Sequence, residues 1–388
     1  MELMRRMKKW LIVGIIGMFL IGIIVPTNNV EAFGGVSARN AVLMDQKTGR
    51  ILYGKAMHDP ERIASITKIM TALLAVESGK LQNTVTISSR AVQTEGSSIY
   101  LKPGQKIKLE DMVYGLMLRS GNDAANAIAE TVGGSIEGFV YLMNEKAKEI
   151  GMSHTYFSNP SGLDQEGKEH YSSAYDMALL TRYAMQNPAY AKIAGTKVHR
   201  APNTAESWDY VWKNKNKLLT FMYKYSTGGK TGFTKKARRT LVSTASKNGM
   251  DLIVVTLDDG QDWKDHMSLF EYGFKNYPLT KVLHNGGIKE VKNSLYRGHV
   301  YLKNDFQFPL DESEKKQVTV TFEMKKPSKN KRIQNDEIVG KAIIELEGEQ
   351  IGARNIFYSE SKVKVFTNEI FQNGKEVLLN LMGEHTDG

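Results

Sequence analysis

A serine and a lysine in the string Ser65-Ile-Thr-Lys68 could act as the nucleophile and base of an enzyme. The string begins an apolar pattern of helical spacing, and residues three apart share one face of a helix, so the Lys68 amine can reach the Ser65 hydroxyl. Ala72 and Ala75 continue that face and would let another segment approach and exclude water. Because desolvation lowers the pKa of a lysine, Lys68 could be uncharged and accept the serine proton.

The Ser-x-x-Lys string does not identify a site by itself. Even at Ser65, a helix cap followed by a lysine whose amine reaches solvent explains the residues equally well. The string also occurs in polar or strand-like surroundings, where we interpret it as exposed surface. These further copies begin at Ser313, Ser328, Ser359 and Ser361.

Two further strings could supply the remaining groups of a peptide-cleaving site. Ser120-Gly-Asn122 lies between two predicted helices and offers a hydroxyl that could relay a proton and an amide that could bind a substrate amide, although it could simply cap a helix. Lys230-Thr231-Gly232 would place a cation opposite a substrate carboxylate, on a strand that accepts an extended peptide. The alternative for this third string is a glycine-rich turn with a surface lysine.

The three strings in this order resemble one family signature. They begin at Ser65, Ser120 and Lys230, and S-x-x-K with S-D-N and K-T-G is typical of β-lactamases and penicillin-binding proteins. The chain from about 38 to 278 resembles the low-molecular-mass penicillin-binding proteins, the serine D-alanyl-D-alanine carboxypeptidases of peptidase type S11. The segments that carry this resemblance beyond the three strings are 64–71, 116–125, 159–163 and 171–178.

The resemblance implies a role for each residue of the three strings. Ser65 would attack the D-Ala-D-Ala bond of a peptidoglycan stem peptide, Lys68 would remove its proton, and Ser120 would pass a proton to the departing D-alanine. The backbone N–H groups of Ser65 and Phe233 would bind the oxyanion. β-Lactam antibiotics would acylate the same serine. The implied substrate-binding residues are Asn122, Lys230, Thr231, Gly232 and Phe233.

Several related functions remain as alternatives to a carboxypeptidase. A DD-endopeptidase would use the same serine, and a β-lactamase would also need a glutamate in a Glu-x-x-x-Asn loop, for which only 369–373 matches. A catalytically silent protein that binds penicillin and the wall is disfavoured by the intact Ser65, Lys68 and Lys230. The segments 230–234 and 257–262 resemble sporulation-associated members of the family.

The amino-acid composition limits which partners and cofactors we expect for this chain. The net charge of +10 favours anionic surroundings such as a phospholipid surface or a cell-wall polymer. The chain has no long Lys/Arg run with interleaved aromatic residues, so nucleic acid is not expected as a partner. It has no cysteine, which excludes disulfides and thiolate metal sites. The histidines are scattered, with His170 interpreted as structural, and no phosphate-binding loop follows a strand, so we expect neither metal nor cofactor.

The resemblance and the hydrophobic patterns together predict the fold. Residues 33–278 are expected to form an α/β (α+β) transpeptidase-like catalytic domain of the penicillin-binding-protein/β-lactamase type, with a mostly antiparallel sheet and a helical region. Residues 279–368 show short alternating segments and are expected to form a small all-β, sandwich-like domain. The predicted helices are 109–119, 122–132, 136–150, 174–186 and 262–275, and the predicted hairpins are 41–45 with 50–53 and 240–246 with 252–257.

Both ends of the chain carry signals of their own. Residues 1–32 combine a basic start, an apolar stretch and small residues before Phe33, which predicts a cleaved signal peptide and export to the outer face of the membrane or the wall. A retained anchor is the alternative. Residues 369–388 are expected to be an amphipathic helical tail that could lie on a membrane surface or pack on its own domain.

Overall fold

The computed structural model describes residues 34–291, 293–326, 332–364 and 377–382. The predicted signal peptide (1–32) and the Glu-x-x-x-Asn string at 369–373 lie outside these residues. Within the described residues, no helix is long and apolar enough to cross a bilayer.

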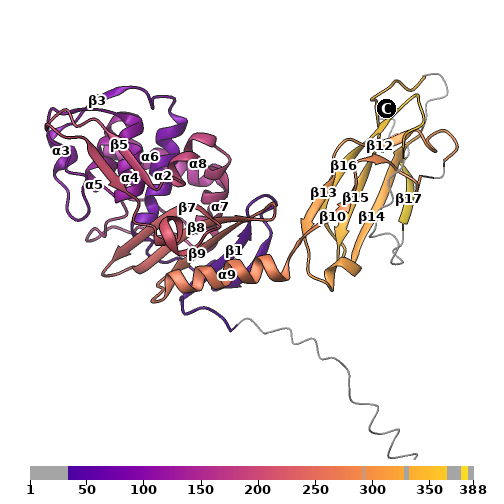
Figure 1. The fold of residues 1–388 in the computed structure, drawn as a ribbon, viewed down its shortest axis with the longest axis horizontal. Helices are drawn as coiled ribbons and strands as arrows, with labels where there is room; N and C mark the ends of the chain where they lie inside the picture. The colour runs from indigo at the N-terminus through magenta and orange to yellow at the C-terminus, as the bar shows by residue number, and fades with distance from the viewer. Residues whose placement is uncertain (1–33, 292, 327–331, 365–376, 383–388) are drawn as a thin grey trace, which may run out of the picture. The chain divides into compact units, whose positions relative to one another are not determined.

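A five-stranded antiparallel sheet joins the beginning and the end of the region before Pro278 (Figure 1). Its central strands are buried without interruption over 40–45, 240–245 and 252–257, as expected for a sheet covered on both faces. The hairpin between the two long strands turns at Asn248 and Gly249, both with positive φ (54° and 78°), as a two-residue turn requires. The strand order is β2 (Ile51–Lys55), β1 (Asn40–Asp45), β9 (Met250–Leu257), β8 (Arg238–Lys247), β7 (Ser226–Thr234).

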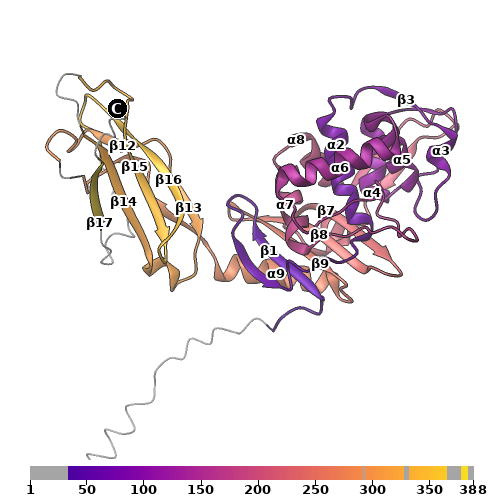
Figure 2. The ribbon, with the colours of Figure 1, turned by 180° about the vertical axis from the view of Figure 1, so that it is seen from behind.

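Helices cover both faces of this sheet (Figures 1 and 2). The helix after the nucleophile string, α2 (Lys68–Glu77), is enclosed so completely that every side chain from Lys68 to Val76 is buried. On the opposite face, α9 (Asp262–Asn276) packs against β8 and β9. The other helices are α3 (Ser89–Val92), α4 (Leu109–Arg119), α5 (Asn122–Gly133), α6 (Ile136–Ile150), α7 (Ala174–Met185) and α8 (Pro188–Ala194).

The region after Pro278 is all-β, as predicted, and has its own apolar core. Burial along β14 alternates residue by residue, which shows one face turned inward and the other toward solvent. A two-stranded sheet pairs β10 (Leu279–Leu283) with β13 (Phe306–Pro309). A six-stranded sheet has the order β11 (Gly286–Gly287), β12 (Val300–Leu302), β16 (Glu349–Tyr358), β15 (Ile338–Leu346), β14 (Val318–Lys325), β17 (Val377–Met382).

The helical prediction for the C-terminal tail was wrong where the structure describes it. Val377–Met382 is a strand that pairs in parallel with β14. The helical wheel considers only which residues share a face, whereas the edge of β14 offers hydrogen-bond partners for an extended backbone. The rest of the predicted tail, 369–376 and 383–388, lies outside the described residues.

Candidate active site

The nucleophile string forms a tight turn at the start of α2. Ser65 lies in a 3₁₀ turn, Ala64–Thr67, and the α-helix begins at Lys68, whereas the sequence predicted a helix that starts at Ser65. Residues three apart eclipse each other in a 3₁₀ turn. The Lys68 Nζ accordingly lies 3.1 Å from the Ser65 Oγ.

Lys68 is buried and surrounded by neutral acceptors. Its Nζ donates to Asn122 Oδ1 at 2.7 Å and to the Ser161 carbonyl at 2.6 Å. Burial, followed by the nearby charges of Lys230 and Lys215, holds the pKa of Lys68 well below its usual value. An uncharged amine has two N–H groups and one lone pair. With both N–H groups engaged, the lone pair is available to the Ser65 hydroxyl.

The second and third strings meet on the other side of Ser65. Ser120 adopts a left-handed conformation (φ 66°) between α4 and α5, and the Lys230 Nζ donates to its Oγ at 3.1 Å. Burial lowers the pKa of Lys230 to about 7, with the charge of Lys215 as a further cause. The structure thus pairs the Ser120 hydroxyl with Lys230. Asn122, not Ser120, is the residue of that string bonded to Lys68.

Strand β7 runs directly beside the nucleophile turn because Gly232 has no side chain. A Cβ at Gly232 would overlap the Thr240 hydroxyl and lie 3.1 Å from the Ser65 backbone nitrogen. The N–H groups expected to bind the oxyanion, those of Ser65 and Phe233, therefore belong to adjoining segments. The Phe233 side chain is 64% exposed, so only its main chain is positioned by the fold.

The cavity that Ser65 lines has a volume of about 310 Å³, which is within the range of small-ligand sites. Its wall includes five residues that the sequence analysis did not single out. Lys215 donates to Ser97 Oγ at 3.2 Å. The other three come together at the start of β8 and the start of α9. The lining residues are Ser65, Ser97, Ser120, Lys215, Thr231, Gly232, Phe233, Arg239, Asp262 and Trp263.

Arg239 is oriented by residues from α9. Its Nη2 donates to both carboxylate oxygens of Asp262, at 2.7 and 2.8 Å, and its guanidinium carbon lies 5.6 Å from the centre of the Trp263 ring. Within the described residues, its buried Nε has no hydrogen-bond partner. The predicted strand 240–246 left out Arg239, which lies opposite Phe233 in the β7–β8 register.

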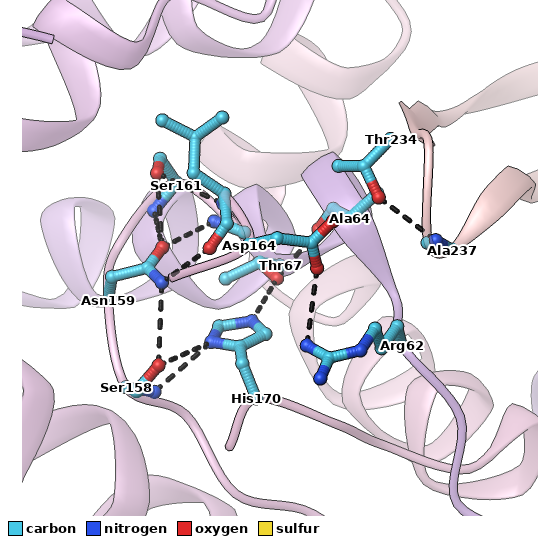
Figure 3. A network of polar contacts seen from close by, with 12 residues as sticks. Arg62, Ala64, Thr67, Ser158, Asn159, Ser161, Asp164, His170, Thr234 and Ala237 are labelled. Carbon is cyan, nitrogen blue, oxygen red and sulfur yellow. Dashed lines mark hydrogen bonds and ion pairs between the residues drawn. The ribbon is translucent and has the colours of Figure 1, made fainter. Parts of the chain in front are cut away.

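A neutral network supports the nucleophile turn from behind (Figure 3). The Thr67 hydroxyl donates to the Ala64 carbonyl at 2.8 Å and lies 2.7 Å from His170 Nε2. The Ser158 N–H donates to His170 Nδ1 at 3.1 Å, so Nε2 carries the proton and donates to Thr67. Burial lowers the pKa of His170 to about 4, which keeps the ring neutral.

The loop that supplies the Ser161 carbonyl is fixed by Asn159 and Gly162. Asn159 Oδ1 accepts from the N–H groups of Ser161, at 3.1 Å, and of Gly162, at 2.7 Å (Figure 3). Gly162 has a positive φ of 78°, and a Cβ there would overlap the Ala64 carbonyl. The sequence resemblance included this loop but gave it no role. Among the described residues, no cluster of three or more side chains is arranged as metal ligands.

Comparison with known proteins places this site in a family context. Residues 27–261 match the family model described as D-alanyl-D-alanine carboxypeptidase, Peptidase_S11. Residues 277–364 match the model of the penicillin-binding protein 5 C-terminal domain.

Individual relatives agree with the family models. The chain is 41% identical over 224 residues to the D-alanyl-D-alanine carboxypeptidase DacF of Bacillus subtilis, a match that spans 56% of each chain. It is 32% identical over 251 residues to DacB2 of Mycobacterium tuberculosis, covering 63% of this chain and 85% of that protein. Penicillin binding protein 5 from Haemophilus influenzae has a similar structure, with a TM-score of 0.65 and 28% identity over 85% of this chain and 98% of that one.

Proposed function

The chain belongs to the D-alanyl-D-alanine carboxypeptidase family, peptidase S11, and we propose that Ser65 carries out the family's reaction. In this reaction Ser65 is acylated by a peptidoglycan stem peptide that ends in D-Ala-D-Ala, and the terminal D-alanine is released. The observation that carries the proposal is the buried Lys68 amine 3.1 Å from the Ser65 hydroxyl. Its hydrogen-bond partners Asn122 and Ser161 leave its lone pair facing that hydroxyl.

Acylation begins with proton transfer from Ser65 to Lys68. The Ser65 Oγ then attacks the carbonyl carbon of the scissile bond, and the negative charge that develops on the carbonyl oxygen is stabilised by the N–H groups of Ser65 and Phe233. Each such donor typically contributes about 3–4 kcal/mol to the transition state. Ser120 delivers its proton to the nitrogen of the departing D-alanine and takes up the proton held by Lys68, so that the C–N bond breaks and Lys68 is uncharged again.

Deacylation reverses these roles with water in place of the amine. Water gives a proton to Lys68, attacks the ester carbonyl, and the Ser65 oxygen leaves as a hydroxyl. Lys230 polarises Ser120 throughout, because its Nζ donates to the Ser120 Oγ. Both steps need only the protein's own groups.

Recognition of the terminal carboxylate involves Lys230, Thr231 and Arg239. The Arg239 Nε is buried without a partner among the described residues, and Asp262 holds the Nη2 end of the guanidinium. A guanidinium with free N–H groups is well suited to a carboxylate. Asn122 would bind the amide on the other side of the scissile bond, in addition to holding Lys68.

The related activities use the same serine and differ in the molecule that acylates it or in the leaving group. β-Lactam antibiotics acylate Ser65 and are released slowly, because the described site has no glutamate placed against the acyl group. A DD-endopeptidase activity would replace D-alanine with a larger leaving group. The carboxypeptidase function is favoured over these alternatives by the family match.

The cellular setting follows from the substrate. Peptidoglycan lies outside the cytoplasm, so we propose that the enzyme works at the outer face of the cytoplasmic membrane or in the wall, after export through the signal at 1–32. A role in sporulation is proposed from the resemblance of segments 230–234 and 257–262 to sporulation-associated members. Docking on a membrane surface is proposed only for the tail outside the strand 377–382, which pairs with β14, and sedimentation with vesicles of the full chain and of a chain ending at 382 tests it.

The deciding experiment is product analysis on a soluble pentapeptide that ends in D-Ala-D-Ala. We expect one equivalent of free D-alanine per peptide, and none with Ser65→Ala. Fluorescent penicillin should label the intact chain, and mass spectrometry should place the adduct on Ser65. Labelling without release of D-alanine would contradict the carboxypeptidase proposal and support a silent binder.

A further inference from the structure

A second groove opens next to the catalytic cavity. It has a volume of about 420 Å³ and lies between the loop 98–102, the end of α4, and the hairpin of β5 (Val198–Ala201) and β6 (Tyr210–Lys213). None of the residues assigned to catalysis above lines it. The lining residues are Ser98, Ile99, Tyr100, Lys102, Arg119, Asn203, Glu206, Trp208, Asp209, Tyr210, Val211 and Trp212.

The groove and the cavity are built from the same segments of the chain. Ser97 faces the cavity and Ser98 the groove; Ser120 faces the cavity and Arg119 the groove. The strand that lines the groove leads within a few residues to Lys215, which lines the cavity. The groove and the cavity therefore adjoin each other along two segments of the chain.

Two aromatic side chains project into solvent at this groove. Tyr100 is 80% exposed and Trp208 is 64% exposed. Tyr210 and Trp212 stack against each other on its floor, with ring centres 4.8 Å apart. Large exposed aromatic side chains that gather at one place commonly mark a binding surface.

Hydrogen bonds of the surrounding loop hold the Tyr100 side chain outward. Its φ of 63° is unusual for a tyrosine, so the surrounding structure must impose it. The buried carboxylate of Asp123 accepts hydrogen bonds from Ser98 Oγ at 2.6 Å, from the Ile99 N–H at 3.0 Å and from the Leu101 N–H at 3.0 Å. The Tyr100 N–H donates to Ser98 Oγ at 2.8 Å. The loop is thus fixed before any ligand binds, which reduces the entropic cost of binding.

The charges around the groove favour an uncharged polar ligand. Lys102 is paired with Glu206, and Arg119 donates to the Lys213 carbonyl at 3.2 Å on the wall that also carries Asp209. Cations and carboxylates are therefore balanced. Asn203 adds an amide. Ring faces for stacking together with amides and carboxylates for hydroxyl groups are the groups that bind a sugar, whose C–H face is apolar and whose edge is polar.

We propose that this groove, lined by Tyr100 and Trp208, binds an N-acetylated amino sugar of the glycan to which the stem peptide is attached. The assignment of this sugar rests on the proposed peptidoglycan function. The C–H face of the sugar packs on Tyr100 or Trp208, and its hydroxyl and acetamido groups meet Asn203, Glu206 and Asp209. The groove then makes the enzyme select glycan-linked peptides over free ones.

The kinetic test compares two substrates that share one pentapeptide. One is the free peptide, and the other carries N-acetylglucosaminyl-N-acetylmuramic acid at its amino end. We expect the KM of the intact chain to be about tenfold lower for the disaccharide-linked peptide, the size of one good aromatic contact. In Trp208→Ala, and separately in Tyr100→Ala, this ratio should fall toward one. Tyr141→Ala is the matched control, because Tyr141 is 65% exposed on α6, and it should keep the ratio.

A binding measurement separates this proposal from the proposed reaction. The Ser65→Ala chain is titrated with the N-acetylglucosamine trimer and, as a control, the glucose trimer maltotriose, and saturation-transfer NMR reports contact. We expect the first to bind and the second not, with loss in Trp208→Ala. Binding of the trimer by the Ser65→Ala chain, together with no release of D-alanine by the original chain, would contradict only the carboxypeptidase proposal. Equal KM values for the two peptides, or a KM ratio that neither groove variant changes, would overturn the sugar site. Displacement of the bound trimer by the free peptide alone would also overturn it.

Discussion

Two lysines of this molecule show how the same side chain becomes a base in one region and a cation in another. Lys146, on α6, lies 2.7 Å from Glu149 and 3.1 Å from Glu77. Burial works to lower its pKa, but the hydrogen bonds to these carboxylates outweigh it and the pKa is raised. Lys68 is more deeply buried, its described partners are neutral, and its pKa is lowered well below the usual value.

The difference lies in the partners rather than in the hydrogen-bond count. A carboxylate stabilises the charged amine, whereas an amide oxygen or a carbonyl satisfies N–H groups without supplying a countercharge. The fold provides Lys68 with Asn122 and the Ser161 carbonyl, and then adds the positive charges of Lys230 and Lys215 nearby. The result is an amine that can be uncharged, and so accept a proton, at neutral pH.

The largest expected effect is the loss of the base. Lys68→Arg keeps a cation of similar length, but a guanidinium does not lose its proton, so acylation of Ser65 should slow by about 10³-fold or more. The rate is measured by penicillin labelling with mass spectrometry of Ser65. Lys146→Arg is the matched control and should change the rate by less than about twofold, because Lys146 does not line the cavity and an arginine keeps the charge that pairs with Glu77 and Glu149. Equal losses of acylation rate in Lys68→Arg and Lys146→Arg would contradict the proposed difference between the two lysines.

The next prediction concerns the loop that supplies the neutral acceptor at Ser161. Gly162→Ala places a methyl group on the Ala64 carbonyl in a left-handed conformation, so we expect the free energy of unfolding to fall by about 3 kcal/mol or more. Gly167→Ala is the control. That glycine has a φ of 68° but nothing within 4 Å of a new Cβ, so its cost should be about 1 kcal/mol. Urea unfolding of both variants, with Lys68-dependent acylation as a second readout, would show whether crowding at Ala64 matters.

The neutral network behind Ser65 predicts a pH dependence of stability. The pKa of His170 is lowered from 6.5 to about 4, so the folded state favours the uncharged ring. Its contribution is present in full above about pH 6.5 and is lost as the pH falls through about 4. The loss is about 3 kcal/mol at about 1.4 kcal/mol per pKa unit.

His170→Gln provides the comparison for that pH dependence. Urea unfolding at a series of pH values between 7 and 4 should show a shallower decline for the variant than for the original chain. His266 remains in both chains and, with its pKa lowered to about 3, contributes in the same direction to each. Parallel curves would mean that His170 does not titrate in this range.

The sequence predicted much of this arrangement because its signals are local. Helical periodicity identified α4 and α6 with their observed bounds, and Asn248-Gly249 identified the β8–β9 turn. The three strings could be joined because each carries its own residue pattern. Lys215 and Arg239 could not be found in that way. Each is a single basic residue in a basic chain, and its position beside Ser65 depends on the pairing of distant strands.

Other differences also arise from tertiary structure. Ser65 lies in a 3₁₀ turn because Gly162 and His170 pack against Ala64 and Thr67 from a segment about a hundred residues away. The pairing of Ser120 with Lys230 joins residues separated by 110 positions. The strand at Val377–Met382 exists because β14 has an edge to pair with. None of these partners is visible in a window of local sequence.

The smallest expected effect tests whether Lys215 tunes both catalytic lysines. Its charge is a cause of the lowered pKa values of Lys68 and Lys230, after burial in both cases. Removing that charge with Lys215→Met should raise both pKa values. Lys68 would then remain protonated to higher pH, which moves the acidic limb of the kcat/KM profile upward. Lys230 would keep its proton to higher pH, which moves the basic limb upward as well.

A steady-state pH profile on the soluble pentapeptide measures both limbs. Lys217→Met is the control, because Lys217 lies two residues further along the chain and is exposed. A change in height without a shift along the pH axis would mean that Lys215 only positions substrate, whereas a joint upward shift would mean that the charge of Lys215 helps keep both lysines uncharged.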